Sequence, residues 1–220
     1  MAVDTPAERR ELPEAIVLDY GAGNLRSVVR AVEHVGYRAT LSDSPDALAR
    51  ASAVILPGVG AAADTISNLR NRGLVEPIKE YIASDRPFLG VCMGLQALMT
   101  VSEEGGEHPC LDVLPGRVVR LADGQTVPHM GWNAVKRLRS SDLFDGIPDG
   151  SHFYFVHSYH CVLDDPSAIL ATTTYGTDIA AVIQHGNIVA TQFHPEKSGA
   201  YGLQIYRNFL HTAFRSAAAN

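Results

Sequence analysis

The first hundred residues repeat one pattern: a short apolar run ends at a glycine- or proline-containing turn, and an amphipathic stretch follows. AIVLD at 15–19 leads through YGAGN into LRSVVRAVEHVG, whose apolar residues recur at helical spacing. SAVILPG at 52–58 precedes helical segments up to Ile82, and PFLGV at 87–91 precedes MGLQALMTV, which we also expect to be a helix. Strands that alternate with helices predict a parallel sheet covered by helices on both faces.

After Glu107 the pattern changes to shorter runs with a period of two, separated by Gly, Asp and Pro. The predicted strands are RVVRL, NAVKRL, HFYFV, SYHCVL, AILATTT, AAVIQ and NIVATQF. A helix from about Gly199 to about Phe214 closes the chain. The sequence therefore predicts one mixed α/β domain over residues 14–217, with a mostly parallel central sheet, flanking helices and additional antiparallel strands in its second half.

Composition excludes several classes of function. The chain has 220 residues, 46% of them hydrophobic, which suits one ordinary globular core. Residues 1–13 are polar and charged, so we expect a disordered leader rather than a secretory signal. No apolar run approaches the roughly 18 residues of a membrane span. The formal charge of −6, without a basic cluster, argues against nucleic acid as a partner. We expect a soluble protein that binds neither membrane nor nucleic acid.

Cysteine and histidine usage bears on compartment and metals. The cysteines are Cys92, Cys110 and Cys161. An odd number in a chain with no export signal predicts free thiols in a reducing compartment, so we expect a cytoplasmic protein. Three histidines near one another are His152, His157 and His160. They form no recognisable metal pattern with cysteine or carboxylate, so we expect neither a metal nor another cofactor.

A glycine-flanked cysteine stands at the third strand-to-helix junction, in Gly90-Val91-Cys92-Met93-Gly94. This is the thiol counterpart of the G-x-S-x-G elbow, in which a strained turn raises the nucleophile to the carboxyl edge of the sheet. The predicted helix behind it would favour the thiolate. A lone cysteine is more often a small buried core residue. The two glycines and the position at the junction favour a nucleophile here.

A base for this thiol follows the strand NIVAT, within QFHPEKS at 192–198. Pro195 ends the strand and would hold His194 at its tip. Glu196 lies two residues later and could reach the far ring nitrogen of His194, as the third member of a triad does. His-x-Glu alone is weak, because the chain has nine histidines. Together with the elbow, it predicts a Cys92–His194–Glu196 triad.

Acyl transfer also needs two N–H donors for the oxyanion, and Pro57-Gly58-Val59-Gly60 could supply one of them. The glycines would allow a backbone conformation that other residues avoid. The amide after the nucleophile, from Met93 or Leu95, could supply the second. The alternative is that PGVG forms a tight strand-to-helix turn and nothing more.

Taken in order, these motifs resemble those of the class I glutamine amidotransferases, and within them the glutaminase subunits of imidazole glycerol phosphate synthase. The elbow and HPE belong to the whole class. DYGAGN, PGVG, GWN and YFVHSY single out this subunit, and the resemblance spans nearly the whole chain after the leader. Departures are few: Met93 and Leu95 exchange Leu and Met relative to the family, and Ala62 replaces a bulkier residue. We expect neither to affect the chemistry.

The resemblance implies a role for each matching position. Cys92 would form a γ-glutamyl thioester, with His194 as general acid and base and Glu196 as its orienting carboxylate. The remaining residues implied at the oxyanion and the substrate glutamine are Gly58, Val59, Gly60, Met93, Leu95, Gln96, Glu104, Ser158 and Tyr159. Gln96 could instead be a solvated helix residue, and Glu104 could form an acidic surface pair with Glu103.

The DYGAGN loop invites comparison with nucleotide-binding loops. Gly21-x-Gly23 lacks the third glycine, because Arg26 stands in its place, so the dinucleotide fingerprint fails. In the family this loop faces a synthase partner, together with the residues at four positions. Here those positions are Asn24, Trp132, Tyr154 and Lys197. A lone Trp is more often core than interface, so Trp132 could also be buried.

The resemblance implies that the chain hydrolyses glutamine and passes ammonia to a (β/α)8 cyclase subunit, which yields imidazole glycerol phosphate and aminoimidazole carboxamide ribotide in histidine biosynthesis. Three alternatives remain open from the residues alone: a glutaminase that serves another synthase, a catalytically inactive binding module, and a cysteine peptidase or hydrolase of the same fold. An intact Cys92, His194 and Glu196 argue against the inactive module.

Overall fold

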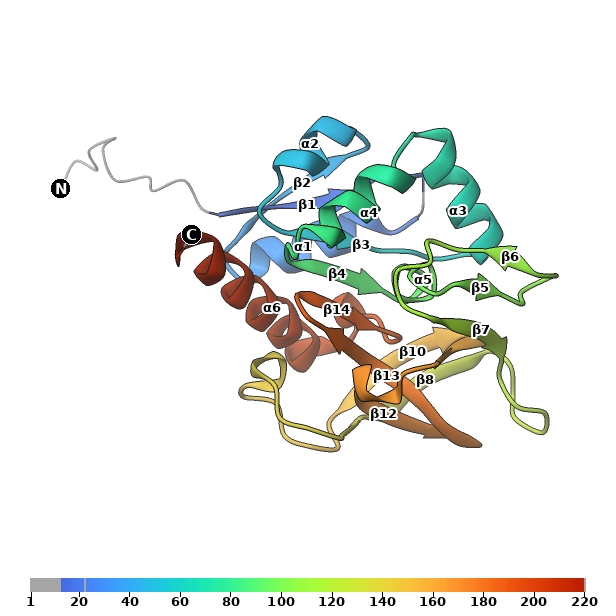
Figure 1. Cartoon of the computed structure of the whole chain (residues 1–220). Helices are drawn as coiled ribbons and strands as arrows, with labels where there is room; N and C mark the ends of the chain where they lie inside the picture. The colour runs from blue at the N-terminus through green and yellow to red at the C-terminus, as the bar shows by residue number, and fades with distance from the viewer. Residues whose placement is uncertain (1–12, 22, 220) are drawn as a thin grey trace, which may run out of the picture.

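The computed structural model describes residues 13–21 and 23–219, and it is built around an eight-stranded sheet (Figure 1). The strand order is β2-β1-β3-β4-β14-β13-β12-β9. The first five run parallel: β2 (Arg38–Ser42), β1 (Glu14–Leu18), β3 (Val54–Leu56), β4 (Phe88–Val91) and β14 (Ile188–Thr191). The other three each pair with their neighbours in antiparallel fashion: β13 (Thr177–His185), β12 (Ile169–Tyr175) and β9 (Lys136–Arg137). The predicted fold class is confirmed.

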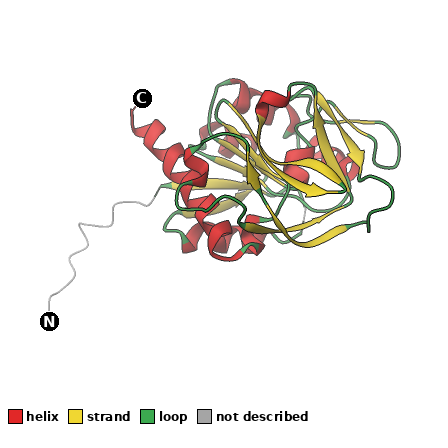
Figure 2. Cartoon of the chain, turned by 90° about the horizontal axis from the view of Figure 1, so that it is seen from below, coloured by secondary structure: helices red, strands yellow, loops and turns green. Residues whose placement is uncertain are grey.

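Helices cover the two faces of the parallel strands (Figures 1 and 2). One face packs against α1 (Leu25–His34) and α6 (Gly199–Ala219). The other packs against α2 (Pro45–Arg50), α3 (Ala62–Asn71) and α4 (Val75–Ala83). Alternate residues of β1 divide between the two cores: Ala15 and Val17 join the first, and Ile16 and Leu18 join the second. A strand buried on both faces reads as a continuous apolar run, as AIVL does.

The second half adds two smaller sheets. A four-stranded sheet consists of β11 (Tyr159–Leu163), β7 (Gly116–Arg120), β5 (Val101–Ser102) and β6 (His108–Pro109). A hydrogen-bonded pair consists of β8 (His129–Ala134) and β10 (His152–His157). Among the described residues, three short 3₁₀ helices complete the elements: η2 (Asp142–Phe144), η3 (Pro166–Ala168) and η4 (Pro195–Lys197). The period-2 runs of the sequence all contribute strands.

The helix expected at MGLQALMTV is much shorter than predicted. α5 spans only Met93–Gln96, and β5 begins at Val101. The backbone N–H groups of Leu111 to Leu114 donate to the carbonyls of residues 97–99, which a longer helix would need for its own hydrogen bonds. A loop distant in sequence therefore ends the helix, which local periodicity does not reveal.

Other expectations concern the termini, the thiols and the membrane. Of the predicted leader at 1–13, all but Pro13 lie outside the described residues. The three cysteines are free thiols, as predicted. Within residues 13–21 and 23–219, no helix is long and apolar enough to cross a membrane.

The carboxyl ends of the parallel strands carry the motifs singled out in the sequence. DYGAGN follows β1, PGVG follows β3, Cys92 follows β4 and the QFHPE segment follows β14. Parallel strands end at one edge of a sheet, so these loops lie side by side. A Cβ on Gly23 would lie 3.7 Å from Val59 Cγ2, which places the first two loops in contact.

Candidate active site

Cys92 occupies a strained turn between β4 and α5, with φ 53° and ψ −99°. The chain can turn this sharply because glycines flank the nucleophile. A Cβ on Gly90 would lie 2.8 Å from the Gly94 carbonyl oxygen, and a Cβ on Gly94 would overlap the Leu56 carbonyl oxygen. Such close approach excludes any other residue, which is the geometry of a nucleophile elbow. The helix behind Cys92 has a single turn, so its dipole is weaker than expected from the sequence.

The general base stands at the end of β14, with its carboxylate partner beside it. His194 Nδ1 lies 2.9 Å from Glu196 Oε1, and each side chain is only 2% exposed. Tyr206 from α6 donates its hydroxyl to Glu196 Oε2 at 3.4 Å. Ser198 Oγ donates to the His194 carbonyl at 2.7 Å and accepts from the Tyr154 amide at 2.9 Å. The ring of His194 is thus fixed from one side, and its buried Nε2 has no hydrogen-bond partner.

Electrostatics favour the imidazolium at His194. Burial opposes its charge, but interactions with Cys92 and with the Glu196 carboxylate outweigh burial and raise the pKa of His194 to about 9. Burial and the neighbouring Glu196 charge raise the pKa of Tyr206 well above its ordinary value, so its hydroxyl remains a donor. Glu196 thus has the ring of His194 at one carboxylate oxygen and the Tyr206 hydroxyl at the other.

A cavity of about 380 Å³ opens above Cys92 and His194. Its other lining residues are Val59, Gly60, Met93, Gln96, Glu104, Pro128, Val156, His157, Ser158, Tyr159 and Lys197. Most residues predicted to hold the oxyanion or the substrate therefore meet around one space. Gly58 and Leu95, which we also predicted there, do not line it.

The predicted substrate residues have defined partners. Gln96 is 2% exposed and donates from Nε2 to the Tyr159 carbonyl at 2.9 Å, so it is not a solvated helix residue. Glu104 Oε2 accepts from the Ala62 amide at 3.0 Å, at the start of α3. Glu103 instead pairs with Arg117 on the surface. The carboxylate of Glu104 thus both lines the cavity and anchors a helix end.

Two residues predicted at the oxyanion, Gly58 and Leu95, have roles that differ from the prediction. Only Gly60 has a positive φ, at +100°; Gly58 is required because a Cβ there would overlap the Tyr20 hydroxyl and lie 2.6 Å from Met93 Cβ. The Leu95 amide donates to the Cys92 carbonyl at 3.0 Å, so it is unavailable as an oxyanion donor. The amide of Met93, first in α5, is the better candidate.

Sequence reasoning assigned no role to three residues that contact the PGVG loop, Cys92 or Glu196 in the structure. Tyr20 is 1% exposed and donates its hydroxyl to the Pro57 carbonyl at 2.9 Å, which orients the PGVG loop. Gln192 Nε2 lies 3.7 Å from Cys92 Sγ, and Tyr206 contacts Glu196. Tyr20 and Gln192 stand inside recognised motifs, so a signal was present for them. Tyr206 lies within a long helix that carries no motif.

The residues predicted to face a partner lie beside this cavity. Trp132 is 55% exposed, and it pairs across β8 and β10 with Tyr154, whose ring lies 6.2 Å away. Lys197 Nζ lies 6.0 Å from the Tyr154 ring. Asn24 begins α1 in a left-handed conformation, in the loop that meets PGVG. Trp132 is therefore a surface residue, and Met130, 63% exposed on the same side of β8, extends the apolar area.

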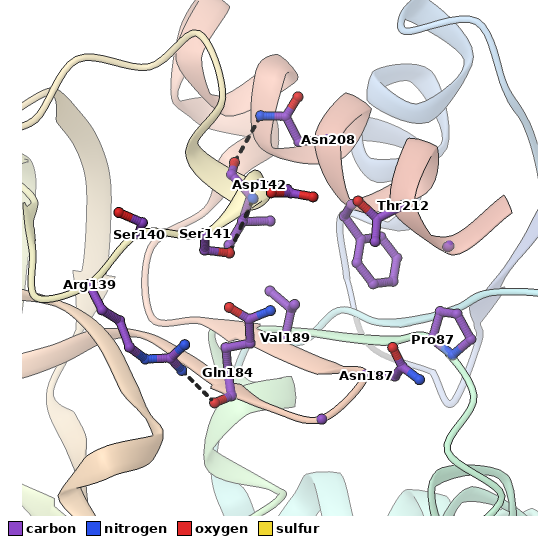
Figure 3. Close-up of a pocket in the computed structure, with 14 residues that line it drawn as sticks. Pro87, Arg139, Ser140, Ser141, Asp142, Gln184, Asn187, Val189, Asn208 and Thr212 are labelled. Atoms are coloured by element: carbon purple, nitrogen blue, oxygen red, sulfur yellow. Dashed lines mark hydrogen bonds between the residues drawn. The ribbon is translucent and has the colours of Figure 1, made fainter. Parts of the chain in front are cut away.

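A second cavity, of about 300 Å³, lies at the opposite edge of the sheet (Figure 3). Pro87 and Asn187, which precede β4 and β14, line it together with Arg139, Gln184 and Asn208. It contains no cysteine or histidine, whereas the cavity over Cys92 contains both a thiol and a base. The described residues also include no cluster of three His, Cys, Asp or Glu suited to a metal. The chemistry therefore belongs to the Cys92 edge.

A buried thiol in an elbow, a carboxylate-oriented histidine and an adjoining cavity are the parts of a cysteine-dependent acyl transferase. The family model described as glutamine amidotransferase class-I matches residues 16–213. The chain belongs to the class I glutamine amidotransferases. This confirms the resemblance inferred from the motifs.

The chain is similar to named members of this class over most of their length. The chain is 52% identical over 197 residues to imidazole glycerol phosphate synthase subunit HisH of Dehalococcoides mccartyi strain CBDB1, covering 90% of this chain and 96% of that protein. It is 50% identical over 193 residues to the same subunit of Moorella thermoacetica, covering 88% and 92%. PurLQS of Thermotoga maritima shares the fold with a TM-score of 0.74 at 18% identity, covering 91% of this chain and 99% of that one.

The elbow makes a prediction about stability. Gly94→Ala should lower the free energy of unfolding by about 3 kcal/mol, because the new Cβ would overlap the Leu56 carbonyl oxygen in a packed region. Urea unfolding followed by circular dichroism measures this. Gly73→Ala is the control: it meets no atom within 4 Å but has φ +66°, so it should cost only about 1 kcal/mol. Equal losses in the two variants would contradict steric exclusion at the elbow.

The raised pKa of His194 makes a prediction about pH. A group that binds its proton more tightly in the folded state stabilises the fold fully below its unfolded pKa of about 6.5, and this stabilisation disappears as pH rises through about 9. Wild type should therefore lose stability between pH 6.5 and pH 9 relative to His194→Asn, by at most about 3 kcal/mol. Urea unfolding of both proteins at several pH values measures the difference, in which the titrating groups that do not interact with His194 cancel. A difference that is constant or grows with pH would contradict the assignment.

Proposed function

We propose that this chain is the glutaminase subunit of an imidazole glycerol phosphate synthase, acting in the cytoplasm in histidine biosynthesis. The observation that carries the proposal is the Cys92–His194–Glu196 arrangement beneath a cavity of about 380 Å³. The family match gives the class of reaction, and the HisH relatives, aligned over most of their length, point to the pathway. The reaction is hydrolysis of glutamine to glutamate and ammonia.

In the proposed mechanism, the Cys92 thiolate attacks the side-chain amide carbon of glutamine and forms a tetrahedral intermediate. Its oxyanion would take hydrogen bonds from the Met93 amide and from the PGVG loop. The imidazolium of His194 gives its proton to the departing nitrogen, so ammonia leaves and a γ-glutamyl thioester remains. His194 then removes a proton from water, which attacks the thioester and releases glutamate and the thiolate.

Glutamine would be held by groups that already line the cavity. Gln96 is fixed in the wall by its bond to the Tyr159 carbonyl. The backbone of Ser158 and Tyr159 offers polar groups to the α-amino and α-carboxylate ends of the substrate, and Glu104 offers a carboxylate to the ammonium. Glu104 also holds α3, so its substitution should affect both binding and stability.

The ammonia product argues for a partner at the rim. In water near neutral pH ammonia becomes ammonium, which no longer acts as a nucleophile, so a shielded exit is needed. Exposed Met130 and Trp132 lie on the side of β8 that borders Tyr154 and Lys197, and Lys197 also lines the cavity. We infer that this face docks a (β/α)8 cyclase subunit, with the DYGAGN loop and Asn24 at its margin. Aromatic residues of this kind are common anchors in interfaces.

Replacement of the nucleophile tests the reaction. In complex with the cyclase subunit of the same organism, Cys92→Ala should lower glutamine-dependent synthesis at least about 10⁴-fold, while synthesis from ammonium salts continues. Both rates are followed by formation of aminoimidazole carboxamide ribotide. Cys110→Ala removes a half-buried thiol that does not line the cavity, and should leave both rates unchanged. Loss of the ammonium-dependent rate in Cys92→Ala would argue against an ammonia donor.

The docking face makes a separate prediction. Trp132→Ala should raise the Kd for the cyclase subunit about 30-fold, the effect of losing an interface anchor worth about 2 kcal/mol. Titration calorimetry measures the affinity. Leu138→Ala is the matched control, since Leu138 is equally exposed at 54% but follows β9 at the far end of the main sheet. Equal affinities for Trp132→Ala and wild type would place the partner elsewhere.

A further inference from the structure

We propose that Gln192 is a further catalytic residue, whose side-chain amide donates a hydrogen bond to the Cys92 thiolate and stabilises it both at rest and as the leaving group of the thioester. The inference rests on the proposed glutaminase reaction. It adds to the triad a group that contacts the reacting sulfur directly, at 3.7 Å from Nε2 to Sγ.

The pairing of two strands places Gln192 next to the nucleophile. β14 runs parallel to β4 with Thr191 opposite Val91, and the Cys92 amide donates to the Thr191 carbonyl at 2.7 Å. The residues that follow these two positions are Gln192 and Cys92. The backbone N–H of Gln192 donates to the Ala181 carbonyl at 2.9 Å, and the residue is 0% exposed. Its side chain is therefore held inside the site on a rigid strand end.

Neighbouring hydrogen bonds fix which end of the Gln192 amide meets the sulfur. The Tyr159 carbonyl can only accept, so the group that Gln96 directs at it, 2.9 Å away, must be its NH₂. The same NH₂ lies 3.3 Å from Gln192 Oε1 and donates to it. The NH₂ of Gln192 is thereby left to face Cys92 Sγ. The geometry therefore directs a hydrogen-bond donor at the sulfur. A thiolate can accept this hydrogen bond, whereas an amide oxygen in the same place would not stabilise it.

Two buried histidines extend the hydrogen-bond network beyond the Tyr159 carbonyl. His157 Nδ1 donates to it at 2.8 Å, which leaves His157 Nε2 as an acceptor for His129 Nδ1 at 3.1 Å. Asn133 Nδ2 donates in turn to His129 Nε2 at 3.3 Å. Each hydrogen bond in this series from Asn133 to Tyr159 therefore has an assigned donor and acceptor. The position of Gln96, and through it that of Gln192, is thus set by a connected network and not by one contact.

A donor to this sulfur has a specific chemical value. Cys92 is 5% exposed, so water provides little stabilisation of its charge. Before attack the sulfur carries the charge, after attack it is a neutral thioester sulfur, and during hydrolysis the carbon–sulfur bond breaks and the charge returns to it. An amide donor favours the thiolate in the first and last of these states. His194 supplies and removes the protons in both half-reactions, so Gln192 gives hydrogen bonding without proton transfer.

Gln192→Met and Gln192→Glu test the role in two ways. Met keeps the volume and removes the donor, and Glu keeps the shape but places an acceptor at the sulfur. Because hydrogen bonds to charged groups are the stronger ones, kcat for glutamine hydrolysis in the cyclase complex should fall roughly 10- to 100-fold in Gln192→Met, and further in Gln192→Glu, with KM changed less. Alkylation of Cys92 by iodoacetamide, followed by peptide mass spectrometry without glutamine, should move to higher pH in both variants.

Gln184→Met is the matched control: it removes another largely buried glutamine amide, on β13, whose side chain lies at the opposite edge of the sheet (Figure 3). Its kcat and alkylation profile should match those of wild type. If Gln192→Met and Gln192→Glu lower kcat but alkylate with the wild-type pH profile, the proposed contact with the thiolate is wrong and the effect is structural. If Gln192→Met fails to assemble, Gln192→Glu decides alone. Alkylation needs no substrate, so failure of the proposed function would appear separately, in wild-type turnover.

Discussion

The parallel pairing of β4 with β14 is the constraint on which the rest of the site depends. It joins segments a hundred residues apart, and the bond from the Cys92 amide to the Thr191 carbonyl fixes the two strand ends relative to each other. A shift of one residue would turn the side chains of β14 to the other face of the sheet. The thiol would then lose both Gln192 and the histidine two residues beyond. The residues that follow β14 therefore supply the partners that the nucleophile needs.

Close backbone packing is the second requirement, and it follows from the first. The elbow can hold Cys92 at a positive φ only because Gly90, Gly94 and Leu56 approach at distances that no Cβ would allow. A strained nucleophile of this kind persists only when its surroundings determine it from several sides. Here the surroundings are two fully buried strands, β3 and β4, so the strain is carried by the interior of the sheet and not by a surface loop.

The sequence reveals residues that satisfy a local rule and conceals those that depend on distant ones. Cys92, His194 and Glu196 stand in short motifs with a chemical reason for each spacing, and the alternation of strands and helices predicts the parallel sheet. The single-turn length of α5 is set by the 111–114 segment, which takes carbonyls that a longer helix would use. Tyr206 reaches Glu196 from a helix that carries no motif, and Gln192 gains its direction only through Gln96 and Tyr159.

Strand β8 connects the exterior of the molecule with this interior. Its alternating side chains expose Met130 and Trp132 on one side and direct His129 and Asn133 to the buried network on the other. The network ends at the Tyr159 carbonyl, which also holds Gln96. The strand that carries Trp132 on its exposed side therefore also carries His129, from which hydrogen bonds run through His157 to the Tyr159 carbonyl and on through Gln96 to Gln192.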